Sequence, residues 1–154
     1  MKQYLTSLHA LAGIAALLLI ISFFSATLVS EIFASQQQWV TVKQCIFYGI
    51  WLLIPLMALT GFSGYKLVSP GKNAGQRRKQ KRMRLIAANG LFILIPAAVF
   101  LKTAAENGYF TSGFYLVQAL ELLAGAVNIS LMILNARDGI RLVRHKARAD
   151  SHSG

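Results

Sequence analysis

Residues Ile46–Gly64 read IFYGIWLLIPLMALTGFSG, an apolar stretch without a charged residue that is long enough to cross a membrane as a helix. Three more stretches of this kind lie on either side of it. A backbone exposed to lipid must satisfy its hydrogen bonds within its own segment, so these stretches are expected to be helices. We predict an all-α, four-helix transmembrane bundle with antiparallel up-down connectivity. The predicted spans cover about residues 5–30, 44–66, 85–102 and 113–136.

The composition excludes a soluble domain. Hydrophobic residues make up 55% of the 154 residues and charged residues only 14%, against about 25% charged residues in soluble domains. Four spans and short loops use the whole chain, so we expect a single membrane domain over residues 1–148. Motifs of soluble enzymes, such as a phosphate-binding Gly-rich loop, are missing. With one cysteine and no Cys/His cluster, we expect neither catalysis nor a metal site.

The basic residues are distributed unequally between the two sides of the predicted bundle. Of the 16 Lys and Arg residues, only Lys43 and Lys102 lie in the first or third loop. Lys and Arg accumulate on the cytoplasmic side of a membrane protein. We therefore predict cytoplasmic N and C termini and placement in a bacterial inner membrane. Residues 149–154 are expected to form a flexible tail.

A cytoplasmic loop is predicted over residues 66–84, and it carries the run RRKQKRMR without an acid. One interpretation is a docking surface for anionic lipids or for an acidic partner. The other is a topology signal, which the positive-inside bias alone explains. No nucleic acid is expected as a partner, because interleaved aromatic residues and a folded module to present the run are both lacking. The residues of this candidate surface are Arg77, Arg78, Lys79, Lys81, Arg82 and Arg84.

The fourth predicted helix contains a stripe of polar and small residues. Intervals of three and four residues place its members on one face. A glutamate facing lipid at the helix centre would cost about 2.5–3.5 kcal/mol, so we expect the stripe to face protein or water. Small residues of the first span and Asn89 of the third offer matching surfaces. The stripe consists of Gln118, Glu121, Gly125, Asn128, Met132 and Asn135.

Glu121 has two interpretations. As a functional group it would carry a proton or bind a cation, because burial disfavours its charged form. As a structural group it would bond to Gln118, Ser22, Tyr48 or a neighbouring subunit. No second acid or basic partner is predicted inside any other span, whereas a transporter usually has more such groups.

His9 is the only histidine inside a predicted span. Membrane b-type haems are usually held between two histidines, although a single-histidine haem with another sixth ligand is possible. The alternative is a polar residue near the inner interface that bonds to Asn89, Asn128 or a lipid headgroup.

Three classes of function remain. The first is a non-catalytic accessory or assembly subunit that packs against other membrane subunits or copies of itself and binds no cofactor. The small-residue faces and the polar stripe favour this class. The second is a small transporter or proton-coupled carrier that uses Glu121. The third is a b-type haem or quinone protein that uses His9.

Overall fold

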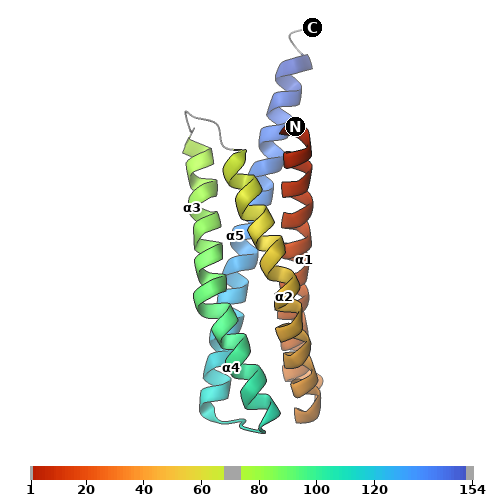
Figure 1. The fold of residues 1–154 in the computed structure, drawn as a ribbon, viewed down its shortest axis with the longest axis vertical. Coiled ribbons are helices and arrows are strands. Elements are labelled where there is room, and N and C mark those ends of the chain that lie inside the picture. Colours follow the sequence, from red (N-terminus) through yellow and green to blue (C-terminus); the bar gives the residue numbers. More distant parts are fainter. Residues whose placement is uncertain (1, 68–73, 152–154) are drawn as a thin grey trace.

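The computed structural model describes the backbone of residues 2–67 and 74–151 and the side chains of residues 4–67 and 75–141. All regular structure in these ranges is helical (Figure 1). The elements are α1 (Lys2–Phe33), α2 (Gln36–Lys66), α3 (Ala74–Asn89), the π-helical segment η1 (Gly90–Leu94), α4 (Ile95–Glu106) and α5 (Ser112–Ser151).

Four helical stretches of the described chain are long and apolar enough to cross a membrane. This confirms the predicted all-α class with four spans and indicates an integral membrane protein. Only 11% of the apolar segment of α2 is buried within the chain. Lipid or other protein must therefore cover the exposed apolar side chains of this helix. The stretches are Tyr4–Phe33, Gln36–Lys66, Gly75–Glu106 and Ser112–Arg141.

The third stretch combines α3, η1 and α4 into one helix with a π-helical segment in its middle. The Ile95 N–H donates to the Gly90 carbonyl, five residues earlier. Pro96 follows directly, and proline has no N–H and crowds the preceding turn. A π-helical turn next to it widens the helix locally, as is common where a helix is interrupted.

The second half of the predicted loop over residues 66–84 is helical, because the basic run lies inside α3. Arg, Lys, Gln and Met are all good helix formers, and residues 74–84 contain no proline. Residues 68–73 lie outside the described residues. The predicted tail differs in the same way: α5 continues to Ser151, and only residues 152–154 of that tail lie outside the described residues.

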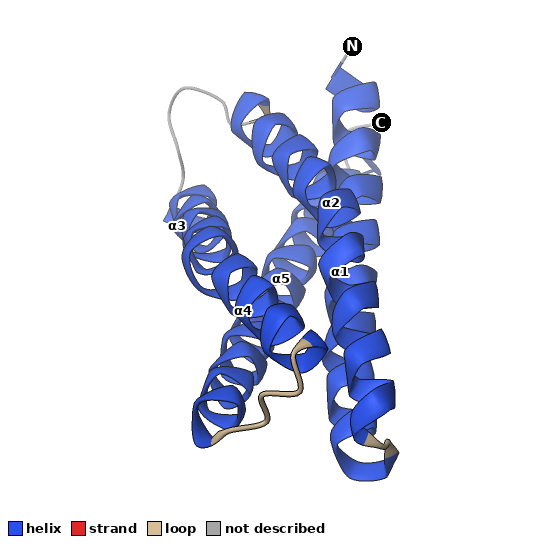
Figure 2. Ribbon diagram, turned by 60° about the horizontal axis from the view of Figure 1, so that its bottom comes forward, coloured by secondary structure: helices blue, strands red, loops and turns tan. Residues whose placement is uncertain are grey.

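The helices pack side by side along the length of the molecule (Figure 1), and Figure 2 shows α2 crossing α1 at an angle. The start of α1 and the end of α5 lie at the same end of the molecule. Ala16 and Ile20 of α1, Ile86 of α3 and Met132 of α5 form one buried core cluster. The small residues of α1 are therefore used in packing within the chain. At the opposite end, Leu101 of α4 and Phe114 of α5 are fully buried beside Trp39.

Candidate functional site

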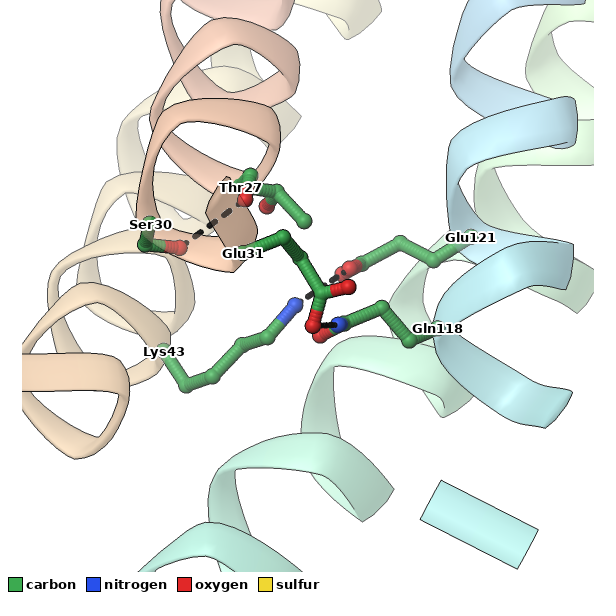
Figure 3. A network of polar contacts seen from close by, with 6 residues as sticks. All are labelled: Thr27, Ser30, Glu31, Lys43, Gln118 and Glu121. Atoms are coloured by element: carbon green, nitrogen blue, oxygen red, sulfur yellow. Dashed lines mark hydrogen bonds and ion pairs between the residues drawn. The ribbon is translucent and has the colours of Figure 1, made fainter. Parts of the chain in front are cut away.

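Four polar side chains from three helices meet between α1, α2 and α5 (Figure 3). We call them the charged cluster: Glu31, Lys43, Gln118 and Glu121. The Lys43 Nζ lies 2.7 Å from the Glu121 Oε2, and these side chains are only 3% and 11% exposed. Beside this ion pair the Gln118 amide donates to the Glu31 carboxylate. The cluster therefore contains one ammonium group and two carboxyl groups.

The ion pair corrects the prediction that no other span contains a basic partner for Glu121, because Lys43 lies inside α2. Tyr48 is 66% exposed, and the Ser22 hydroxyl donates to the Leu18 carbonyl in its own helix. Of the suggested neighbours, Gln118 belongs to the same cluster but bonds to Glu31. The sequence interpretation began the second span after the last charged residue, and it therefore assigned Lys43 to a loop.

A capping signal in the sequence places Lys43 inside α2. Ser35 and Gln38 form a capping box, in which the Ser35 N–H donates to the Gln38 Oε1 at 2.8 Å. The spacing S-x-x-Q marks the start of a helix. Lys43 then lies seven residues after Gln36, about 10 Å along the helix at 1.5 Å per residue. Its side chain enters the interior because a carboxylate is there to pair with it.

Aromatic packing borders the charged cluster toward the end of the bundle. The Trp39 indole N–H donates to the Ser30 carbonyl at 2.7 Å. Its ring contacts Phe110 edge-to-face and stacks on Phe114, with centroids 5.4 and 6.4 Å apart. Trp39, a residue of α2, thus joins the end of α1 to the loop between α4 and α5 and to the start of α5. These contacts fix the positions of the α1 and α2 ends that carry Glu31 and Lys43.

A small cavity of about 60 Å³ adjoins Glu121 on the side away from these aromatics. Thr27 and Gly125 also line it, and the remaining walls are apolar, including Phe23 and Leu94. A water molecule needs about 10–15 Å³ of such volume and polar partners. The cavity therefore has room for a few waters or a small cation, with the Glu121 carboxyl group at its wall.

A second polar site lies between α3 and α5. The Asn89 Nδ2 donates to the Asn128 Oδ1 and to the Ala124 carbonyl, both at 2.8 Å. Asn89 is 9% exposed and Asn128 only 1%. Asn135, the last member of the stripe, is 8% exposed, and its Oδ1 has no hydrogen-bond partner among the described residues. The structure thus buries Gln118, Asn128 and Asn135, but their partners differ.

His9 lies at the contact between α1 and α2. Its Nδ1 is 3.0 Å from the Thr60 carbonyl and 3.1 Å from the Ser63 hydroxyl, so the expected bonds to Asn89 or Asn128 are wrong. The reason is that α1 packs on α2 at this level, whereas the two asparagines belong to the α3–α5 contact. Within the described residues, no group of three or more His, Cys, Asp or Glu side chains could hold a metal ion.

The basic residues of α3 separate into two sets. The Arg82 guanidinium is 2.7 Å from the Asp138 carboxylate of α5, and the Lys79 ammonium lies 3.5 Å from the position of a Cβ built on Gly139. These two cations therefore face α5. The other members of the predicted surface are exposed: Arg77, Arg78, Lys81 and Arg84.

Comparison with known proteins gives no relative for this arrangement. No protein-family model, curated protein or solved structure matches the chain.

Proposed function

We propose that this chain is a small, non-enzymatic membrane protein that binds and releases a proton at the charged cluster, as a proton-coupled carrier does. The observation that carries the proposal is the imbalance of one ammonium group and two carboxyl groups at a site where Lys43 and Glu121 are 3% and 11% exposed and Glu31 is half-buried. A buried net charge is strongly disfavoured. One bound proton, or one bound cation, restores neutrality. Ionisable residues inside membrane spans commonly belong to ion pathways or proton relays.

The position of each carboxyl group supports a division of roles. Lys43 neutralises Glu121 directly. Among the described residues, Glu31 has an amide partner in Gln118 and no cation paired with it, and it lies close to the end of α1 at Phe33. Glu31 is therefore the better position for the exchangeable proton. The cavity beside Glu121 supplies space for water on the interior side.

The test is proton flux in vesicles that contain the purified protein and a pH-sensitive dye. Glu31→Gln and Glu121→Gln each leave one ammonium and one carboxyl group, which is a balanced cluster without a proton to exchange. Both variants should abolish a flux that the wild type supports. Glu106→Gln is the matched control, because this acid pairs with Lys102 at the protein surface. An inert wild type, or flux unchanged in both cluster variants, would defeat the proposal.

We also propose the membrane topology that the basic residues suggest: up-down connectivity, both termini in the cytoplasm, and a bacterial inner membrane. The exposed cations Arg77 and Lys81 of α3 and Arg137 and Arg141 of α5 support this orientation. The charged cluster then lies toward the external side.

An accessory or assembly subunit is the second candidate. The small residues that favoured it in α1 are buried within the chain, but a different feature supports it. An open groove of about 370 Å³ lies at the ends of α1 and α2, lined by Ala26, Val29, Ser30, Phe33, Ala34, Gln38 and Val42. Small residues allow close approach of another helix. Purification in gentle detergent should then return a stoichiometric complex that Ala34→Trp disrupts, and recovery of a monomer alone would contradict this role.

The haem or quinone alternative depends on His9. Its Nδ1 contacts join α1 to α2, and a Cβ on Gly64 would lie 3.0 Å from the His9 Cε1. This close packing gives the alternative no support, and an absorbance spectrum of the purified protein tests the haem.

A further inference from the structure

One face of α3 is basic, and the turn of the helix determines which basic side chains lie on it. Successive residues of an α-helix are about 100° apart around the axis. Arg77, Lys81 and Arg84 therefore fall within an arc of about 60°. All three are exposed. We call them the outward triad.

The opposite side of α3 is occupied by contacts within the chain. Arg82 pairs with Asp138, and Ile86 and Asn89 are buried against neighbouring helices. The Asp138 carboxylate is thus already paired with Arg82, which faces α5. Among the described ion pairs, none involves a member of the outward triad. The three positive charges of the triad are therefore not paired with any carboxylate among the described residues.

The outward triad is also continuous with a membrane span. Gly75–Glu106 is one of the stretches able to cross a membrane, and the apolar part of this helix begins at Leu85, directly after Arg84. From Arg77 to Arg84 the helix rises about 10 Å. The headgroup layer of each leaflet is only about 5–8 Å thick by difference of the total and hydrocarbon thicknesses. When Leu85 enters the hydrocarbon, the backbone positions of Arg84 and Lys81, about 1.5 and 6 Å from it, lie within this layer. Arg77, about 12 Å away, lies just outside it, and its long side chain can reach back to the phosphate groups.

We propose that the outward triad binds the headgroups of anionic phospholipids and holds them beside α3. The charge is complementary to the phosphate groups, and basic residues next to a span attract anionic lipids. Arginine in particular presents a planar fork of donors that fits a phosphate. This goes beyond a topology signal, because it requires an ordered set of cations on one face rather than a count of charges in a loop.

The experiment measures the association of spin-labelled phosphatidylglycerol and phosphatidylcholine with the reconstituted full chain. The wild type should prefer phosphatidylglycerol by about threefold or more. The variant Arg77→Gln/Lys81→Gln/Arg84→Gln should bind the two lipids nearly equally. The matched control, Lys66→Gln/Arg137→Gln/Arg141→Gln, removes three other exposed cations and should keep most of the preference. High salt should reduce the wild-type preference.

Several outcomes would overturn the proposal. A wild type without preference is one, and an equal loss in the control variant is another, because the effect would then follow net charge alone. Binding of polyglutamate through the same three residues, without a lipid preference, would identify an acidic polypeptide as the occupant instead. If the triple glutamine variant inserts poorly, Arg77→Lys/Arg84→Lys keeps the charge and should retain a preference that is still lost in high salt.

Discussion

Lys43 is the residue on which the charged cluster depends. Lys43→Met leaves the mostly buried Glu121 without its ammonium partner, and breaking a buried pair in this way typically costs about 3–5 kcal/mol. We expect a loss of this order in the free energy of unfolding, measured by denaturant titration in micelles. The double variant Lys43→Met/Glu121→Leu removes both charges and should recover most of the loss. Equal stability of the wild type and Lys43→Met would show that the pair is not formed.

Asn128 gives a prediction of smaller size. Asn128→Leu removes the acceptor of one Asn89 hydrogen bond, while the Ala124 carbonyl remains as a second acceptor. Hydrogen bonds between membrane helices contribute about 0.6 kcal/mol on average and rarely more than about 1.7. We expect a loss of about 1 kcal/mol in the same unfolding measurement. Ser130→Ala is the control, because Ser130 is exposed and its hydroxyl donates to the Ala126 carbonyl of its own helix. An equal change in the two variants would contradict the role of the amide contact.

At the scale of single residues, the sequence predicts burial better than partners. The interval pattern of α5 places Gln118, Asn128 and Asn135 on one face, and all three are buried. It cannot predict that Gln118 bonds to Glu31 or that Glu121 pairs with Lys43. Those contacts depend on how far α1 and α2 extend beyond their uncharged segments. A charged residue can be buried near the end of a membrane-spanning helix when it pairs with a residue of opposite charge on another helix.

The contact between α1 and α2 depends on a glycine. A Cβ on Gly49 would overlap with the Phe23 Cζ, so Gly49→Ala forces the ring to move. Because Phe23 borders the small cavity, the ring has some room, and we expect a cost of about 1 kcal/mol, at the low end for overpacking. The double variant Gly49→Ala/Phe23→Leu should show a smaller loss than the sum of the single ones.

Gly61→Ala is the matched control in the same helix. Apart from its chain neighbours and the backbone of its own helix, no described heavy atom lies within 4 Å of a Cβ on Gly61. Alanine is favoured over glycine in a helix by about 1 kcal/mol or less, so this variant should be neutral or more stable. A loss in Gly61→Ala as large as that in Gly49→Ala would show that the loss in Gly49→Ala does not depend on the close approach of α1.

At the scale of elements, the apolar segments were predictable but the helical run that precedes the third one was not. Apolar runs locate the four spans, because lipid requires them. They say nothing of residues 74–84, which are polar and nevertheless helical. This segment extends a helix that the span already nucleates, and adding a residue to an existing helix is far easier than starting one. Assigning loops wherever charges occur therefore underestimates helix length.

For the whole molecule, orientation in the membrane is the property that links the proposals, because it puts the charged cluster and the outward triad at opposite ends. Cysteine labelling in bacterial cells tests it. In a Cys45→Ser background, Gln37→Cys and Asn107→Cys place exposed thiols in α2 and after α4. Both should react with an impermeant reagent added outside the inner membrane. Gly75→Cys, at the start of α3, should react only once that membrane is opened.

The unmodified chain is a separate control, because its Cys45 is exposed on α2 within a predicted span. Surrounded by lipid, it should react slowly from either side. The opposite pattern, with Gly75→Cys labelled from outside, would invert the bundle and place the outward triad against the external leaflet. Labelling of all three engineered thiols in intact cells would contradict a membrane-spanning arrangement altogether. The lipid preference of α3 and the access of protons to Glu31 would then both need a different physical explanation, since each depends on which aqueous phase its end of the bundle meets.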